Sequence, residues 1–206
     1  LRALEVLKSA DYIIAEDSRV TGKLLSRFSI KKPIIVVHHH SKDTSYERVI
    51  SLLKEGKDLA LVTDAGTPGI SDPGGMLIEK VTRALGDSVT ISPIPGASSV
   101  TAALSVAGFP GDEFTFFGFL PKKKGRAKAL EEIITCPRTA IFFESPHRIV
   151  KTLTFLKDNL ASDRMLVVTR ELTKKFETIY RGNSEAVLAK VLSPGPRGEY
   201  TIVIRK

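Results

Sequence analysis

The stretch Asp58-Leu59-Ala60-Leu61-Val62-Thr63-Asp64-Ala65-Gly66-Thr67-Pro68-Gly69-Ile70-Ser71-Asp72-Pro73-Gly74-Gly75 decides the fold of this chain. Its apolar start, residues 59–62, predicts a buried strand. Glycines and prolines then interrupt the pattern, and a helical pattern follows that Gly86 ends. The loop therefore follows the carboxyl end of a strand, which is where ligands bind in open α/β sheets. An ordinary βα turn would also contain glycine and proline, but the length of the loop and its two aspartates, Asp64 and Asp72, favour a binding site.

Apolar runs of strand length alternate with helical patterns along the rest of the chain. Strands are predicted at 12–15, 34–37, 59–62, 89–92, 114–119, 139–143, 165–169, 176–181 and 200–204. The alternation predicts a mainly parallel sheet in the first half, and the adjacent strands near the end predict a mixed sheet in the second. The fold class is thus α/β with two α/β domains. Glycine and proline cluster at 108–111, which places the predicted domains at 1–110 and 111–206.

Composition and net charge limit the class of protein and the kinds of partner that the chain can have. The chain has 206 residues, of which 42% are hydrophobic and 26% charged, as in an ordinary globular protein. The net charge of +8 indicates an anionic partner, with nucleic acid as the first candidate and an acidic membrane surface as the second. No apolar run is long enough to span a bilayer. The single cysteine, Cys136, excludes an internal disulfide and favours a reducing cytoplasm.

A second loop rich in glycine and proline follows the predicted strand at 89–92 and leads into a helix of small residues. Neither loop matches a Walker loop or a Rossmann fingerprint, which argues against a nucleotide hydrolase and a dinucleotide enzyme. The pattern favours a small polar cofactor held by backbone groups, with a helix N-terminus that could receive a carboxylate. The predicted cofactor-binding residues are Asp64, Ala65, Gly66, Thr67, Pro68, Pro93, Pro95, Gly96, Ser98 and Ser99.

Charged residues at the strand ends of the second half are candidates for acid–base chemistry, although solvated loop charges would give the same pattern. The residues that could supply it are Glu144, His147, Glu171, Lys174 and Glu177. Because Glu144, Glu171 and Lys174 lie at strand ends, these three are the catalytic candidates, and the sequence does not choose among them. A lysine would need a depressed pKa to act as a base. A lysine run such as residues 122–124 is usually solvated surface, but the positive net charge of the chain favours a contact with phosphate. The predicted RNA-binding residues are Lys122, Lys123, Lys124, Arg126 and Arg148.

The run His38-His39-His40 suggests a metal site, but a zinc site needs at least three protein ligands and nothing nearby completes the set. Polar cleft or turn histidines are the preferred interpretation, and no metal is predicted.

A series of short motifs follows in a fixed order along the chain. They are Ala15-Glu16-Asp17-Ser18-Arg19, Asp64-Ala65-Gly66-Thr67-Pro68, Asp72-Pro73-Gly74, Pro93-Ile94-Pro95-Gly96, Gly118-Phe119-Leu120-Pro121, Glu144-Ser145-Pro146-His147-Arg148, Arg170-Glu171-Leu172-Thr173-Lys174 and Gly198-Glu199. Together they resemble the small-subunit ribosomal RNA methyltransferases of the tetrapyrrole (corrin/porphyrin) methylase family. The resemblance implies S-adenosylmethionine as methyl donor, held in a cleft between two α/β domains. It also implies a homodimer that methylates a cytidine ribose 2′-hydroxyl in the decoding region of 16S ribosomal RNA.

The same resemblance implies an opening strand and a Pro-Ile-Gly-Asn-Leu loop upstream of Leu1, and a C-terminal helical extension in many members. The family's His-x-His-Asn-Glu motif reads here as His38-His39-His40-Ser41-Lys42. Two alternatives stay open. A small-molecule methylase would act on a corrin precursor, which is also anionic, although the motifs at 144–148 and 170–174 argue against it. A non-catalytic RNA-binding relative would keep the fold without binding the donor, so a donor titration would separate it from the enzymes.

Overall fold

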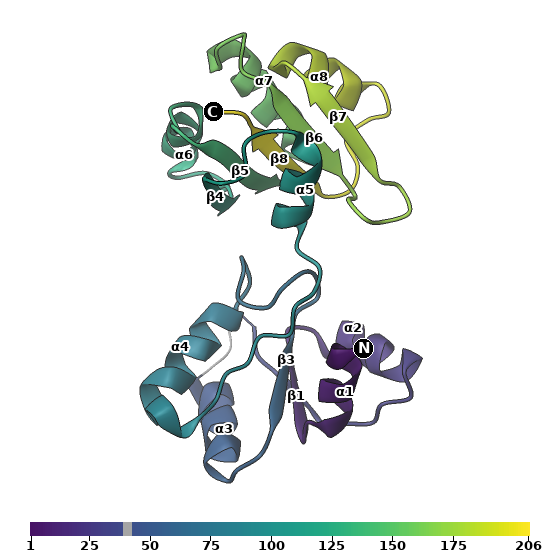
Figure 1. Ribbon diagram of the computed structural model, residues 1–206, viewed down its shortest axis with the longest axis vertical. Coiled ribbons are helices and arrows are strands. Elements are labelled where there is room, and N and C mark those ends of the chain that lie inside the picture. The colour runs from purple at the N-terminus through teal and green to yellow at the C-terminus, as the bar shows by residue number, and fades with distance from the viewer. Residues whose placement is uncertain (39–42) are drawn as a thin grey trace. The chain divides into compact units, whose positions relative to one another are not determined.

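The chain folds into two units, Leu1–Ala97 and Ser98–Lys206, each built around its own sheet (Figure 1). The computed structural model describes residues 1–38 and 43–206. The predicted α/β class with a parallel and a mixed sheet is confirmed.

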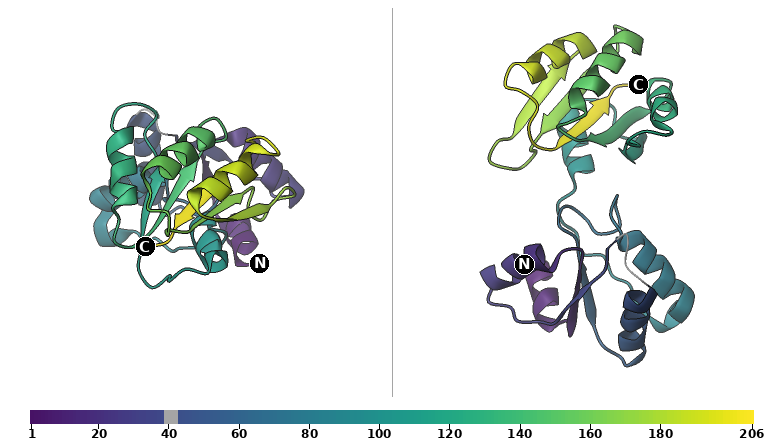
Figure 2. Two further views of the ribbon diagram at one scale, coloured as in Figure 1. Left: turned by 90° about the horizontal axis from the view of Figure 1, so that it is seen from above. Right: turned by 180° about the vertical axis from the view of Figure 1, so that it is seen from behind.

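The first unit is a sheet with helices on both faces (Figures 1 and 2). Its parallel strands lie in the order β2 (Ile34–Val36), β1 (Tyr12–Ala15) and β3 (Leu59–Val62). Its helices are α1 (Arg2–Ser9), α2 (Ser18–Arg27), α3 (Asp43–Lys54) and α4 (Gly74–Leu85). Successive side chains of a strand point to opposite faces, so Ile13 packs against α1 and α2 while Ile14 packs against α3 and α4. The parallel order brings the carboxyl ends of all three strands to one edge.

The strand predicted at 89–92 is absent, and this prediction is wrong. After the short 3₁₀ helix η1 (Gly86–Ser88), Val89 has an extended backbone, but no strand among the described residues pairs with this segment. Ile91 is 47% exposed, and Pro93 and Pro95 have no N–H to offer a neighbouring strand. An apolar run becomes a strand only when its backbone groups pair with a neighbouring strand, and residues 1–38 and 43–206 provide no such strand for this segment.

The second unit contains a five-stranded mixed sheet. Its strands lie in the order β4 (Phe114–Phe119), β5 (Thr139–Glu144), β8 (Tyr200–Ile204), β6 (Leu166–Arg170) and β7 (Thr178–Gly182). Strand β8 runs antiparallel to both of its neighbours, β5 and β6. One face is covered by α6 (Arg126–Ile134), α7 (Ile149–Asn159) and α8 (Ser184–Leu192), and the other by α5 (Ser99–Ala107) (Figures 1 and 2).

The boundary between the units lies between Ala97 and Ser98, whereas the sequence predicts a domain boundary after Pro110. Helix α5 is the reason, because Val100, Ala103 and Ala107 bury their side chains against the sheet of the second unit. The glycine- and proline-rich segment 108–111 is a turn inside that unit, where Gly108 ends α5 in the left-handed conformation.

Candidate functional site

Asp72 shapes the loop between β3 and α4. Its Oδ1 accepts hydrogen bonds from the backbone N–H groups of Gly69, at 2.8 Å, and Gly74, at 2.7 Å. A Cβ added at Gly74 would lie 2.8 Å from the backbone nitrogen of Gly69, so this close approach requires glycine. The other Asp72 oxygen, Oδ2, is buried without a hydrogen-bond partner in the described part of the chain. The main role of Asp72 is therefore to stabilise the conformation of the loop.

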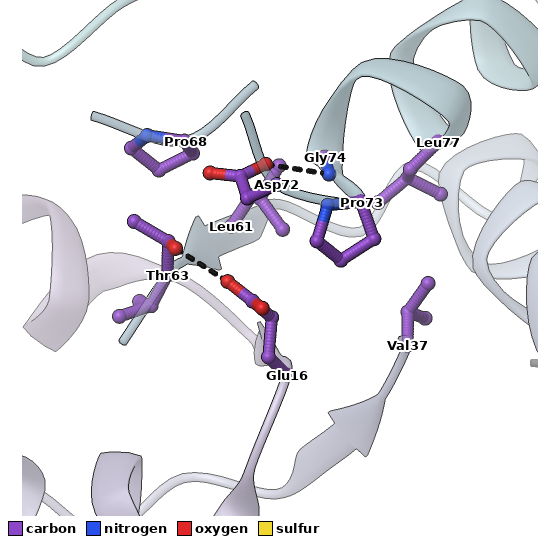
Figure 3. Close-up of a pocket in the computed structure, with 10 residues that line it drawn as sticks. Glu16, Val37, Leu61, Thr63, Pro68, Asp72, Pro73, Gly74 and Leu77 are labelled. Carbon is purple, nitrogen blue, oxygen red and sulfur yellow. Dashed lines mark hydrogen bonds between the residues drawn. The ribbon is translucent and has the colours of Figure 1, made fainter. Parts of the chain in front are cut away.

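A small pocket lies between this loop and the carboxyl ends of the three strands (Figure 3). Its wall includes the first residue after each strand, namely Glu16, Val37 and Thr63. The Thr63 hydroxyl donates a hydrogen bond to Oε1 of Glu16 (Figure 3). Glu16 was not among the predicted site residues. The sequence signal was its position directly after the strand at 12–15, which places it at the same sheet edge as Thr63.

Asp64 is an exposed carboxylate at this edge. Desolvation raises its pKa, and the nearby negative charges of Glu16 and Asp17 raise it further. Asp17 itself is paired with Arg19 at 2.6 Å, and hydrogen bonds from Arg19 lower the Asp17 pKa to about 2. The edge is therefore acidic, and it suits a small molecule that carries a positive charge or hydroxyl groups.

The two loops predicted to bind the cofactor meet within the first unit. The Thr67 hydroxyl donates to the backbone oxygen of Ala97 at 3.1 Å, and a Cβ added at Gly66 would lie 3.8 Å from that same oxygen. Residues 64–68 thus lie against the end of the segment 93–97. Ser98 and Ser99 begin the second unit, where Ser98 is the N-cap residue of α5.

The strand ends of the second unit also share an edge. Glu144, the last residue of β5, lies opposite Tyr200 of β8, and Tyr200 lies opposite Arg170, the last residue of β6. Glu171 follows directly. The structure therefore brings the candidates Glu144 and Glu171 to one edge of one sheet.

Glu144 is fully buried and fully engaged. Its Oε2 pairs with Arg126 Nη2 at 2.7 Å and accepts from the Thr152 hydroxyl at 2.7 Å. Its Oε1 lies 2.8 Å from Arg148 Nε and accepts from the Ser145 N–H at 2.8 Å. Both carboxylate oxygens of Glu144 are therefore occupied by donors of the surrounding protein. This environment is that of an anchoring ion pair, not of a general base.

Glu171 and Lys174 form a second, more exposed cluster with Glu199. Lys174 Nζ lies 2.7 Å from Glu199 Oε2 and 3.3 Å from Glu171 Oε1. The hydrogen bond to Glu199 raises the Lys174 pKa, with smaller help from the charges of both glutamates, so this lysine is cationic at neutral pH. The Glu199 N–H donates to Glu171 Oε1 at 2.8 Å, and this backbone hydrogen bond is the main reason that the Glu171 pKa is lowered.

The backbone around Glu171 is specialised. Glu171 has a φ of 48°, which is uncommon for a residue with a side chain. A Cβ added at Gly198, itself at φ +77°, would lie 2.5 Å from Glu171 Cγ, so glycine leaves the space that the glutamate fills. The motifs at 170–174 and 198–199 thus come together as one cluster, although Glu199 was not among the predicted site residues.

The five predicted RNA-binding residues divide into two groups. Lys122, Lys123 and Lys124 are exposed. Arg126 and Arg148 point inward to Glu144, with side chains only 18% and 20% exposed. Arg148 Nη1 also donates to the backbone oxygen of Leu120 at 2.8 Å, so the two arginines hold the base of the loop that carries the lysines.

The described residues contain no group of three or more His, Cys, Asp or Glu side chains arranged to hold a metal ion. The histidine run lies only partly within them, since His39 and His40 fall outside the described ranges. No helix within 1–38 or 43–206 is long and apolar enough to cross a membrane.

Residues 1–188 match the family model for tetrapyrrole (corrin/porphyrin) methylases. The chain belongs to the tetrapyrrole methylase family. A relative from Xylella fastidiosa is 44% identical over 207 residues, which cover 99% of this chain and 75% of the relative. A relative from Thermotoga maritima is 38% identical over 204 residues, which cover 99% of this chain and 90% of the relative. Both are named ribosomal RNA small subunit methyltransferase I.

Solved structures of tetrapyrrole methylases share the fold. A cobalt precorrin-4 methyltransferase of cobalamin biosynthesis aligns with a TM-score of 0.68 at 20% identity, covering 100% of this chain and 87% of that protein. A uroporphyrin-III-C-methyltransferase from Thermus thermophilus aligns with a TM-score of 0.66, also at 20% identity, with the same coverage. At this identity the likeness describes the fold alone.

Proposed function

We propose that this member of the tetrapyrrole methylase family transfers a methyl group from S-adenosylmethionine to small-subunit ribosomal RNA. The acceptor is the ribose 2′-hydroxyl of a cytidine in the decoding region. The observation that carries the proposal is the identity of 38% to 44% over nearly the whole chain to relatives named as small-subunit ribosomal RNA methyltransferases. The ordered motifs resembling that group support the choice of the 2′-hydroxyl.

The acidic edge of the first unit supports binding of this donor. S-adenosylmethionine carries a sulfonium, an ammonium and two ribose hydroxyls, and it supplies an electrophilic methyl group. Asp64 offers an exposed carboxylate to the hydroxyl or ammonium groups, beside the charge of Glu16. Small residues at 65–66 and 96–97 let the ligand approach the backbone closely. We therefore propose residues 64–68 and 93–99 as the donor site.

The acceptor hydroxyl is a weak nucleophile until a base takes its proton. Among the three catalytic candidates, Glu144 is held by two arginines, and the neighbouring glutamates raise the pKa of Lys174 and keep it protonated. Within the described part of the chain, both hydrogen bonds to the Glu171 side chain are accepted by Oε1. We propose that Glu171 receives the proton through Oε2, and that Lys174 positions it. Alignment of donor and acceptor supplies most of the remaining rate enhancement.

The basic surface of the chain supports an RNA substrate. The net charge is +8, and the exposed residues Lys122, Lys123 and Lys124 form a compact cationic loop. We propose that this loop contacts RNA phosphate. We also propose a homodimer, as the resemblance implies, which sedimentation equilibrium of the purified protein would test. The single cysteine supports a location in the cytoplasm.

A methyl-transfer assay with two acceptors tests the proposal. Donor labelled in its methyl group is incubated with the protein and either small ribosomal subunits or a corrin precursor. We expect label in the ribosomal RNA alone. Label in the corrin would favour a small-molecule methylase. Donor binding without transfer to either acceptor, or no donor binding at all, would contradict an active RNA methyltransferase.

A further inference from the structure

Phe119 has a large apolar side chain that is exposed to solvent. It is the last residue of β4 and is 57% exposed. Its ring centroid lies 5.0 Å from that of Phe143, and Phe143 in turn contacts Phe116 edge-on at 5.0 Å. The exposed ring therefore packs against Phe143, which Phe116 supports in turn, and this contact orients it.

A bulge in β4 creates this orientation. Phe116 pairs with Ile141, but Phe119 pairs with Phe143, so β4 contains one more residue than β5 between these two pairs. Gly118 absorbs the extra residue at φ +64°. In a regular strand, Phe116 and Phe119 would point to opposite faces. The bulge turns Phe119 to the face of Phe116 and Phe143, at the edge where the strands of this unit end.

The residues that follow Phe119 along the chain lead into a run of positive charge. Leu120 is buried, and its backbone oxygen accepts from Arg148, whose guanidinium is fixed by Glu144. The backbone oxygen of Pro121 accepts from Arg126, which Glu144 fixes as well. From this anchored base the chain continues into the exposed lysines 122–124. A rigid aromatic face next to a cationic loop is the combination with which proteins bind single-stranded nucleic acid.

We propose that Phe119 stacks on an unpaired base of the substrate RNA while the loop of Lys122–Lys124 contacts the adjoining phosphates. The proposal rests on the proposed function, because it names the form of RNA that this edge receives. Glu144, Arg126 and Arg148 are positioning residues in this arrangement, since they hold the backbone that joins the ring to the lysines.

Binding of a short unstructured RNA oligonucleotide, measured by fluorescence anisotropy without donor, tests the stacking. Phe119→Leu should weaken binding about tenfold, and Phe119→Trp should keep or strengthen it. The salt slope should stay unchanged in both, because stacking releases no counterions. Phe176→Leu is the matched control: Phe176 is 65% exposed, but Lys175 Nζ already lies 5.6 Å from its ring centroid, and we expect parental affinity.

Three results would overturn the proposal. Parental affinity in Phe119→Leu would show that the ring is an ordinary exposed side chain. Weaker binding to intact small subunits but not to the oligonucleotide would mean that the ring docks on protein. Loss of donor affinity would assign the ring to the donor site. A methyl-transfer assay separates this proposal from the proposed function. If the parent transfers methyl groups but Phe119→Leu does not weaken RNA binding, only the stacking is contradicted. If the parent is inactive but Phe119→Leu weakens RNA binding as predicted, only the methyl transfer is contradicted.

Discussion

Glu144 shows how far one buried charge can determine the role of its neighbours. Its side chain has no exposed area, and it neutralises both Arg126 and Arg148. Glu144→Gln should lower the free energy of unfolding by about 3 kcal/mol, because two guanidinium groups would lose their buried counter-charge. Urea denaturation measures this. The matched control is Glu132→Gln on α6, whose carboxylate is 55% exposed and 3.9 Å from Lys128, and which should change stability by less than about 1 kcal/mol. A stable but inactive Glu144→Gln would instead favour a chemical role.

Glu171 gives a prediction on pH. Its pKa in the folded protein is lowered, mainly by the hydrogen bond from the Glu199 N–H, so its ionised form stabilises the fold. That contribution is present above the ordinary glutamate value of 4.5 and is lost as the pH falls through the lower folded value. Parent and Glu171→Gln should therefore differ in stability at neutral pH and converge in acid. Denaturant titrations over a pH series measure the difference, and a gap that stays constant into acid would contradict this account of the cluster.

In the loop between β3 and α4, we expect one aspartate to bind the donor and another to stabilise the fold. Asp64 is exposed, whereas Asp72 holds the loop through two backbone N–H groups. Asp64→Ala should weaken donor binding by about tenfold or more, as expected for a lost hydrogen bond to a charged group, without a change in stability. Asp72→Ala should lower both donor affinity and stability. Calorimetric titration with the donor measures the affinities, and unchanged affinity in a folded Asp64→Ala variant would remove this loop from the site.

The loop that follows β4 offers a second test at this scale. Lys122, Lys123 and Lys124 are exposed, while Arg126 is occupied by Glu144. Changing the three lysines to alanine should reduce the salt slope of RNA binding by up to about 2 units, since each contact with single-stranded phosphate contributes about 0.7. Donor affinity should not change. Lys128→Ala on the exposed side of α6 is the control. A triple variant with the parental affinity and slope would mean that the loop is only solvated surface.

Across the whole molecule, the sequence predicted the parts that local patterns determine. Strand positions, the parallel and mixed sheets and the loop at 64–75 follow from periodicity and from glycine and proline. The strand prediction at 89–92 was wrong because strand pairing depends on a neighbouring strand, which the sequence of the segment itself does not reveal. The boundary between the units differs from the predicted domain boundary because a turn at 108–111 and a domain linker have the same composition. Only the packing of Val100 and Ala103 distinguishes the two.

Side-chain partners were the least predictable feature. Nothing in the motif at 144–148 says that Glu144 faces inward or that Arg126, distant in sequence, closes on it. Glu199 joined Glu171 and Lys174 only through the order of strands in the sheet. Residue types at strand ends thus indicated an edge rich in charge, while the roles of the individual charges required the structure.

The central claim is methyl transfer to a ribose 2′-hydroxyl of ribosomal RNA. Small subunits that lack the modification are incubated with the parent protein and S-adenosylmethionine, and the RNA is digested to nucleosides for mass spectrometry. We expect a new 2′-O-methylcytidine, with the added mass on the ribose fragment, and a reduced yield with Asp64→Ala. A methyl group on the pyrimidine ring, or RNA that stays unmodified while the protein binds the donor, would contradict it.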